Sequence, residues 1–132
     1  MVVYHLDLQR LRVASATFPF DAVKPSEVYL RILADKELHT AVHTTINYFE
    51  LVSLAILRGY VDEPTMYLSL CVVLPWTAKT FAPYTEGERR RYNDRAVHID
   101  VERLSNAWSS GRLLTTNEVA PKPLAADSPS TV

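Results

Sequence analysis

The sequence predicts an all-α fold, a compact bundle of about five helices. Glycine occurs only 3 times in 132 residues, and long windows of the chain carry apolar residues at helical spacing. Aspartate, proline and glycine stand at the ends of these windows, as is typical of residues that begin and stop helices. We expect a helical domain over residues 1–112 and a disordered C-terminal tail over residues 113–132, because the tail is rich in proline and small polar residues.

The N-terminal region has an ambiguous pattern. Residues 3–17 alternate as a strand does, but they also place apolar side chains on one helical face, and we favour helix. Pro19 disfavours helix at the residue before it, so we expect residues 17–24 to form a connector. A short helix then starts near Pro25, since the missing N–H of proline costs nothing in a first turn.

The clearest helical signal runs from Lys36 to Arg58. Asp35 precedes it as a capping residue that can accept first-turn N–H groups. Gly59 follows it, where a left-handed conformation is favoured. Because the second half of this segment, LVSLAIL, is apolar nearly all round, we expect it to lie at the centre of the bundle.

A fourth helix is expected from Glu63 to Phe81, with Asp62 as its cap. Pro75 lies inside it, so the pattern fits either one helix with a kink at Pro75 or two helices that break there. Asp94 is expected to cap a last helix that stops at Gly111. These helices predict a shared core, made of Phe49, Val52, Ile56, Leu70, Val73, Leu104 and Trp108.

Charge and cysteine content exclude some classes of protein. A formal net charge of -1 argues against a strong nucleic-acid binder, which needs a basic excess, and against a mimic of DNA. Cys71 is the only cysteine, so no internal disulfide can form, and its apolar neighbours favour an inert thiol. The start of the chain lacks the pattern of a secretory signal, and no apolar run is long enough to cross a bilayer. We therefore expect a cytoplasmic protein without a membrane segment.

Polar side chains recur on one face of the long helix. His39, His43, Asn47 and Glu50 lie at spacings of three and four residues, which places them within a narrow arc of the helical wheel. They form either a solvated face or a partly buried polar network. In the network, Glu50 is expected to pair with an arginine such as Arg103, because a buried carboxylate must be paired or protonated.

Two histidines four residues apart can also be metal ligands. The metalloprotease pattern further needs a glutamate directly after the first histidine as general base, and Thr40 stands there instead. Nothing in the sequence places a third ligand, for which His5, His98 and Asp100 are the candidates. We therefore predict no metal, no cofactor and no catalytic residue. The candidate polar network consists of His43, Asn47, Glu50 and Arg103.

A basic stretch near the last helix is a candidate interaction patch. Arginines and an aromatic residue recur within one short segment, as in patches that bind phosphate or an acidic protein. The patch consists of Arg89, Arg90, Arg91, Tyr92 and Arg95. Glu86, Glu88 and Asp94 reduce the local charge, so an exposed loop or helix end is the plainer interpretation, and binding of nucleic acid is not expected.

Several motifs between Leu33 and Trp108 resemble an uncharacterised family. The matching segments are LADKEL, INYFELVSLAILRGYVDE, Trp76, FAPYTEGERR and VERLSNAW, and the most specific part is NYFE followed by RG-x-x-DE. The family is a helical domain of bacteria and their phages whose members often carry a membrane helix ahead of the domain, and we expect no such helix in this chain. The resemblance implies an all-helical fold and a prokaryotic or phage setting. It implies no activity, cofactor or catalytic residue.

The residues assemble no recognisable active site, so we expect a non-enzymatic protein–protein interaction module. The resemblance suggests a small accessory protein of a phage or mobile element that binds and modulates or inhibits host machinery, such as a defence complex. A protein partner is expected, and a homodimer is one form of it, because two central helices are apolar on more than one face. Two alternatives stay open. One is a metal-dependent enzyme that uses His39, His43 and Glu50, and the other is a weak nucleic-acid binder that uses the residues from Arg89 to Arg95.

Overall fold

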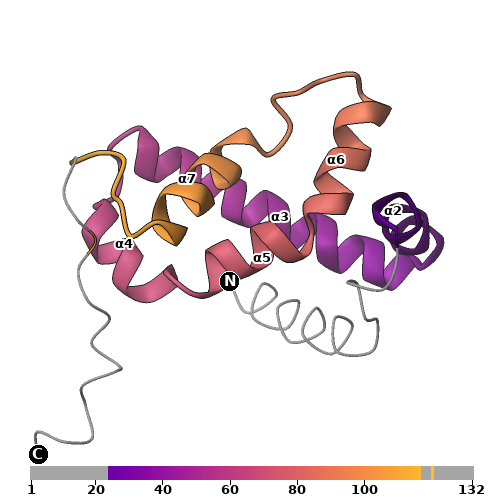
Figure 1. The fold of residues 1–132 in the computed structure, drawn as a ribbon, viewed down its shortest axis with the longest axis horizontal. Helices are drawn as coiled ribbons and strands as arrows, with labels where there is room; N and C mark the ends of the chain where they lie inside the picture. Colours follow the sequence, from indigo (N-terminus) through magenta and orange to yellow (C-terminus); the bar gives the residue numbers. More distant parts are fainter. Residues whose placement is uncertain (1–23, 117–119, 121–132) are drawn as a thin grey trace, which may run out of the picture.

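The computed structural model describes residues 24–116 and 120, and the regular structure of this part is helical (Figure 1). The all-α prediction is confirmed, with six described helices in place of about five. They are α2 (Pro25–Ala34), α3 (Lys36–Leu57), α4 (Glu63–Leu70), α5 (Val73–Thr80), α6 (Ala82–Arg91) and α7 (Ile99–Ser109). The expectations for residues 3–17 and for most of the connector lie outside the described residues.

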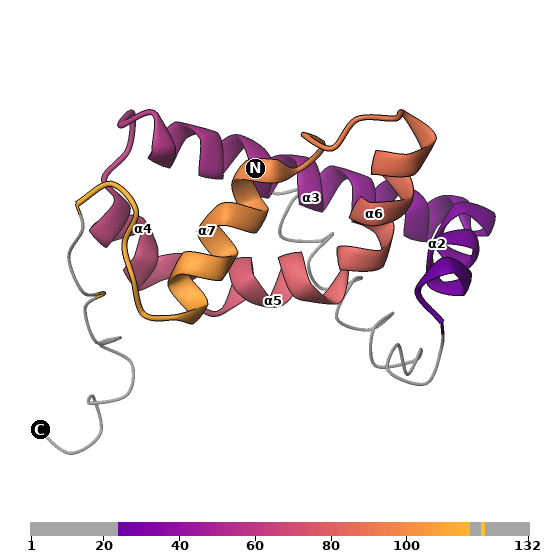
Figure 2. The same cartoon turned by 45° about the horizontal axis from the view of Figure 1, so that its top comes forward.

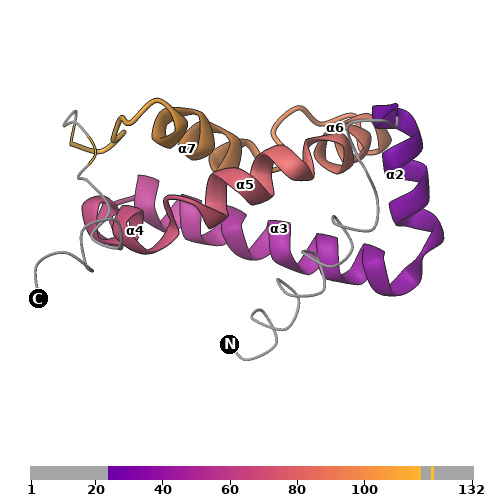
Figure 3. The ribbon, with the colours of Figure 1, turned by 60° about the horizontal axis from the view of Figure 1, so that its bottom comes forward.

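The long helix α3 is the spine of the fold. In Figure 3 it forms one layer, with α5, α6 and α7 above it, while α2 stands at one end and α4 at the other. Helix α7 lies between α3 and α5, as Figure 2 shows, and packs against both. Helix α2 packs against the first half of the spine and against α6. None of the described helices combines the length and the apolar character needed to cross a membrane.

Local signals at both ends of α3 act as predicted. Asp35 Oδ1 accepts a hydrogen bond of 3.1 Å from the backbone N–H of Leu38. At the other end Gly59 has a φ of 78°, and its N–H donates to Ile56 at 3.0 Å while the N–H of Tyr60 donates to Ala55 at 2.9 Å. This pair of bonds is a Schellman motif, which satisfies the last carbonyl groups of the helix.

Two apolar cores lie along α3. The first joins α2, α6 and the first half of α3, and contains Val28, Ile32, Leu38, Ala41, Val42, Ile46, Phe81 and Tyr84. The second joins the rest of α3 to α4, α5 and α7, and includes Phe49, Ile56, Leu104 and Trp108 from the predicted core. The other predicted members, Val52, Leu70 and Val73, are partly buried against it.

The predicted fourth helix is two helices. Helix α4 ends at Leu70 and α5 begins at Val73, so the regular helix is interrupted at residues 71 and 72, ahead of Pro75. Pro75 is then the third residue of α5, where a backbone N–H has no partner within the helix. A break before Pro75 thereby avoids the lost hydrogen bond that proline causes inside a continuous helix.

The last helix starts later than predicted and has a different cap. Asp94 Oδ1 accepts the N–H of Ala96 at 2.9 Å, within the turn that precedes the helix. Helix α7 begins at Ile99, and two of its first N–H groups are satisfied from α3. Glu50 accepts the N–H of Val101 at 2.8 Å and that of Asp100 at 3.4 Å. A carboxylate at the positive end of a helix dipole is favourable.

The folded domain extends past the predicted boundary at residue 112. Leu113 is buried, and the buried carboxylate of Glu63 accepts hydrogen bonds from the backbone N–H groups of Leu114 and Thr115 at 2.7–3.0 Å. It also accepts the indole N–H of Trp108 at 2.9 Å. Residues 113–115 are therefore fixed against α4 rather than being part of a disordered tail.

Candidate functional site

The hydroxyl group of Tyr84 joins three polar side chains at the contact between α3 and α6. It lies 3.2 Å from His39 Nε2 and 3.0 Å from His43 Nδ1. It donates a hydrogen bond of 2.7 Å to Glu88 Oε1, one turn further along α6. Tyr84 and Glu88 are buried, His39 is half-buried and His43 is exposed. The cluster therefore reaches from the interior of the first core to the surface.

Helix α2 contributes a second tyrosine to this cluster. Tyr29 donates to the other carboxylate oxygen of Glu88 at 3.1 Å. Its ring lies directly on Gly87, where an added Cβ would stand 2.3 Å from ring carbons. The absence of a side chain at Gly87 is thus what lets α2 and α6 approach closely enough for Tyr29 to reach Glu88.

A chain of hydrogen bonds continues from His43 towards α7. Asn47 Nδ2 lies 3.0 Å from His43 Nε2, and Asn47 Oδ1 lies 3.0 Å from Nε2 of the buried His98. Thr85 Oγ1 is 3.2 Å from His98 Nδ1. The candidate network predicted around His43 and Asn47 is therefore connected, and it extends to α6 and α7.

The hydrogen bonds that link these side chains all point in one direction. Because Asn47 Oδ1 can only accept, His98 carries its proton on Nε2 and accepts from Thr85 on Nδ1. Because Asn47 Nδ2 can only donate, His43 accepts on Nε2 and donates from Nδ1 to the Tyr84 oxygen. The Tyr84 hydroxyl in turn donates to Glu88, so every bond points towards this carboxylate.

Burial fixes the charge state of the groups inside the chain. Desolvation by burial, and to a lesser degree the nearby His43, lowers the pKa of His98 to about 4. His98 is therefore neutral near pH 7. Burial is the largest cause that raises the pKa of Tyr84, and the hydrogen bond to Glu88 is the next largest. The phenol therefore stays protonated and acts as a hydrogen-bond donor.

Glu50 and Arg103 do not join the network. Glu50 accepts hydrogen bonds from N–H groups in the first turn of α7. Arg103 contacts Asp100 at 4.0 Å on the surface of that helix. Burial is the largest effect on Glu50 and raises its pKa, while the bonds from Val101 and Asp100 act in the opposite direction. The interaction partner of Glu50 is thus a helix terminus rather than the predicted arginine.

The predicted basic patch is divided by the fold. Arg89 is buried, donates from Nε to the carbonyl of Val97 at 2.9 Å and pairs with Glu102 at 2.8 Å. The other four residues are exposed. Of these, Arg95 forms a two-bond pair with Glu86, to which Arg90 also lies within 3.7 Å.

Sequence reasoning missed three members of the cluster, Tyr29, Tyr84 and Glu88, and named His98 only as a candidate third metal ligand. The polar residues around Glu88 predict an exposed loop or helix end instead of a buried carboxylate. The spacing of Tyr84 and Glu88, four residues apart on a helix, is a signal that could have paired them. No local pattern could have brought Tyr29 or His98 to the same place.

Three of the clustered side chains are arranged as metal ligands can be. His39, His43 and Glu88 each offer one ligand atom, and these atoms lie within 4.8 Å of one another. Two imidazoles and one carboxylate are a ligand set that zinc accepts. Among the described residues the third candidate ligand is therefore Glu88 of α6 and not His98, Asp100 or Glu50. His5 lies outside the described residues.

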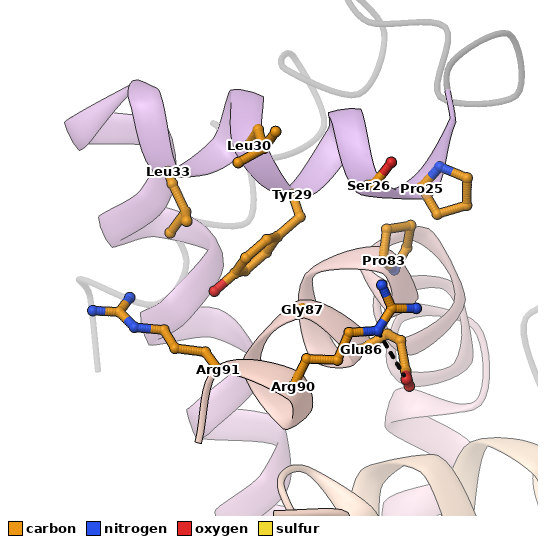
Figure 4. Close-up of a pocket in the computed structure, with 10 residues that line it drawn as sticks. All are labelled: Pro25, Ser26, Tyr29, Leu30, Leu33, Pro83, Glu86, Gly87, Arg90 and Arg91. Atoms are coloured by element: carbon orange, nitrogen blue, oxygen red, sulfur yellow. Dashed lines mark ion pairs between the residues drawn. The ribbon is translucent and has the colours of Figure 1, made fainter. Parts of the chain in front are cut away.

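A groove runs between α2 and α6 beside this cluster (Figure 4). Its volume is about 500 Å³, and apolar side chains form most of its lining. The residues are Pro25, Ser26, Tyr29, Leu30, Leu33, Pro83, Glu86, Gly87, Arg90 and Arg91. Figure 4 shows the ring of Tyr29 between the two helices, with Arg90 and Arg91 on the α6 side. Tyr29 thus belongs both to the groove and to the Glu88 cluster.

A second, more polar pocket of about 310 Å³ lies among α5, α6 and α7. Arg89, Thr85 and His98 line it, together with Lys79. Arg89 Nη2 is buried and has no hydrogen-bond partner among the described residues. Glu86 and Glu102 line the same pocket, so its charges are balanced.

The family can be named from the comparison with known proteins. No curated protein and no solved structure matches the chain. A family model described as a domain of unknown function, DUF4760, matches residues 9–108. This range covers most of the chain, including all the helices described above apart from the last residue of α7. The resemblance to an uncharacterised helical family is confirmed, and the chain belongs to the domain-of-unknown-function family DUF4760.

Proposed function

We propose that this domain is a non-enzymatic protein-interaction module that binds a segment of a partner protein in the groove between α2 and α6. The observation that supports this proposal is the groove itself, about 500 Å³ in volume and mostly apolar. Leu30 in its wall is 62% exposed, which is unfavourable for a large apolar side chain in water. Concave apolar surfaces with a few polar groups are typical of binding sites.

The charges around the groove select the chemistry of the partner. Arg90 and Arg91 are exposed on the α6 side, and the exposed Arg95 follows in the loop after α6. Among the described residues that line the groove, Glu86 is the one that is acidic, and Arg95 already engages both of its oxygens. The groove edge therefore carries net positive charge. The occupant that fits is a segment with apolar anchors and flanking aspartate or glutamate residues.

The groove walls are held in place before any partner arrives. Tyr29 is fixed from α2 by its bond to Glu88 and by its contact with Gly87. A preformed wall reduces the ordering entropy that binding must overcome. This rigidity supports the proposal that the groove is a binding surface and does not collapse when no partner is bound.

Selection from a displayed library of random peptides against the full chain tests this function. Enriched peptides should combine apolar residues with aspartate or glutamate, and their amide shifts should map to Leu30, Leu33 and Arg91. Reversing both charges, Arg90→Glu with Arg91→Glu, should weaken binding about tenfold or more, since two charge pairs are lost. Affinity should also fall with added salt.

Two matched controls make this result specific to the groove. Leu51 on α3 is 64% exposed, a fraction similar to that of Leu30, but it does not line the groove. Leu51→Asp should therefore leave peptide binding unchanged, whereas Leu30→Asp should abolish it. Arg103→Glu reverses an exposed charge outside the groove and should have no effect. Peptides without acidic residues, or binding that survives at reversed Arg90 and Arg91, would contradict the proposal.

The two alternative functions have weaker support. The enzyme hypothesis placed Glu50 beside the histidines, and Glu50 is engaged with the α7 backbone. The nucleic-acid hypothesis needs arginines that face outward together, but Arg89 is buried and Glu86 offsets Arg95. That the partner belongs to a host defence complex stays a prediction.

A further inference from the structure

We propose that His39, His43 and Glu88 form a binding site for one divalent transition-metal ion of the zinc class. The proposal goes beyond the interaction function and does not depend on it. Two of the three ligands stand one turn apart on α3, and the third comes from α6, so an ion would connect the two helices. The three ligand atoms already lie within 4.8 Å of one another.

The donor set fits zinc better than magnesium or calcium. Imidazole nitrogen suits zinc, cobalt, nickel and copper, whereas magnesium and calcium prefer sites made of oxygen alone. Zinc binds nitrogen and oxygen at about 2.0–2.2 Å, which puts tetrahedral ligands about 3.4 Å apart. The present spacing therefore has to contract by about 1.4 Å at most. His43 is exposed and His39 is half-buried, so both rings have room to rotate.

The buried member of the site is prepared for a cation. Glu88 is 4% exposed, and its two oxygens accept from Tyr84 at 2.7 Å and Tyr29 at 3.1 Å. Each carboxylate oxygen has two lone pairs, so Glu88 can bind an ion without losing either tyrosine. Such support of a ligating carboxylate by hydrogen bonds is typical of metal sites.

The hydrogen-bond chain behind His43 can present the correct ring nitrogen. In the arrangement described above, His43 Nδ1 carries a proton and donates to Tyr84. If the amide of Asn47 turns over, Asn47 Oδ1 accepts from His43 Nε2–H, and Nδ2 donates to Nε2 of His98. His98 then carries its proton on Nδ1 and donates to Thr85. All three contacts of the chain persist, and the lone pair of His43 Nδ1 is released for a metal.

Asn47 is therefore a positioning residue for the site. It touches His43 but not the ion, and it determines which nitrogen of the imidazole is free. Partners of this kind commonly change metal affinity by about 10- to 100-fold when they are removed. Asn47→Ala should weaken binding by about this factor, while Asn47→Asp should retain it, because a carboxylate also accepts from His43 Nε2–H. A purely structural role of Asn47 would not give this rescue.

The experiment uses the full chain, stripped with a chelator and titrated with Co²⁺ and then with Zn²⁺ in competition. About one ion per chain should bind, Co²⁺ should show the visible absorption of a tetrahedral site, and Zn²⁺ should raise the melting temperature, since it binds the folded chain. His39→Ala, His43→Ala and Glu88→Gln should each weaken binding more than about tenfold, because three protein ligands are needed. Glu37→Gln and Glu27→Gln, which remove exposed carboxylates outside the site, are the matched controls and should bind as the unchanged protein does.

The histidine variants keep the test decisive if Glu88→Gln fails to fold. His43 lies on the surface, so His43→Ala should have the helix content of the unchanged protein in the presence of chelator. Loss of metal binding with intact helix content supports the site. Absence of stoichiometric binding by the unchanged protein, or binding that survives His43→Ala, would overturn it.

Discussion

Tyr84 donates a hydrogen bond of 2.7 Å to Glu88, and both side chains are buried between α3 and α6. The same hydroxyl accepts from His39 and His43, so four side chains share one oxygen atom. An ionised carboxylate in the interior is stable only when it is paired or hydrogen-bonded. The Tyr84 hydroxyl is therefore a structural requirement of Glu88 as well as part of the proposed metal site.

The first prediction concerns the Tyr84 hydroxyl. Tyr84→Phe removes the shortest bond to Glu88 while keeping the buried ring, and it should lower the free energy of unfolding by about 1–3 kcal/mol. Urea denaturation monitored by circular dichroism measures the loss. Tyr92→Phe is the matched control, since Tyr92 is 62% exposed, and its stability should be unchanged. Equal stability of the two variants would show that Glu88 does not depend on Tyr84.

The second prediction concerns the contact of Gly87 with Tyr29. Alanine in a helix is favoured over glycine by about 1 kcal/mol, so Gly87→Ala would stabilise α6 on propensity alone. A Cβ at 2.3 Å from the Tyr29 ring cannot be accommodated, and the clash should dominate. We expect Gly87→Ala to lower stability and to weaken binding of peptides in the groove.

A double variant separates the clash from other effects. In Tyr29→Ala the ring is absent, so adding Gly87→Ala to it should restore the helix-propensity gain and raise stability. The two substitutions should therefore be strongly non-additive, as residues in direct contact are. Additive losses in unfolding experiments would mean that the cost of Gly87→Ala arises elsewhere.

The sequence predicted the features of this fold that depend on interactions between residues close in sequence, and it did not predict those that depend on residues far apart. The ends of α3 were predicted correctly because Asp35 and Gly59 act on backbone groups within a few residues. The segment of α6 was judged exposed because Glu88 and Arg89 are charged. Glu88 is also bonded to Tyr29, 59 residues before it, and Arg89 pairs with Glu102 on the next helix. Burial of a charge depends on such partners, and no local pattern reports them.

The candidate site shows the same limit. The spacing of His39, His43 and Asn47 on one helical face was sufficient to predict that they belong together. The sequence did not predict which acidic residue joins them, because Glu50 and Glu88 can only be distinguished once α6 and α7 are placed on α3. The start of α7 was mispredicted for a related reason, since its cap comes from Glu50, 51 residues before Val101.

The third prediction concerns Glu63 and pH. Burial alone raises the pKa of Glu63, but the hydrogen bonds from Leu114, Trp108 and Thr115 outweigh it, and the net pKa is lowered. The ionised form is thus favoured by folding. This contribution to stability is complete above the ordinary glutamate pKa of 4.5 and is lost as the pH falls through the lowered value.

Glu63→Gln tests this linkage. The neutral amide is a weaker acceptor and presents an NH₂ group to backbone donors, so stability near pH 7 should fall by about 2–3 kcal/mol. Acid unfolding should then depend less on pH below 4.5 than in the unchanged protein. Glu37→Gln, an exposed substitution in α3, should keep the original pH profile. An unchanged profile in Glu63→Gln would exclude Glu63 as a source of acid sensitivity.

The last prediction concerns assembly. Large apolar side chains remain exposed where α4 meets α5, with Leu68 at 40% and Val72 at 75% of full exposure. Exposed apolar surface commonly marks an interface, and a two-fold dimer is the most frequent way to cover one. We expect light scattering at micromolar concentration to give twice the chain mass of 15.0 kDa. Val72→Asp should return the protein to the mass of one chain, because a buried unpaired carboxylate opposes association. The groove variant Leu30→Asp should leave the dimer intact, since it lies on α2. A mass of 15.0 kDa for the unchanged chain would assign these side chains to the surface of a monomer.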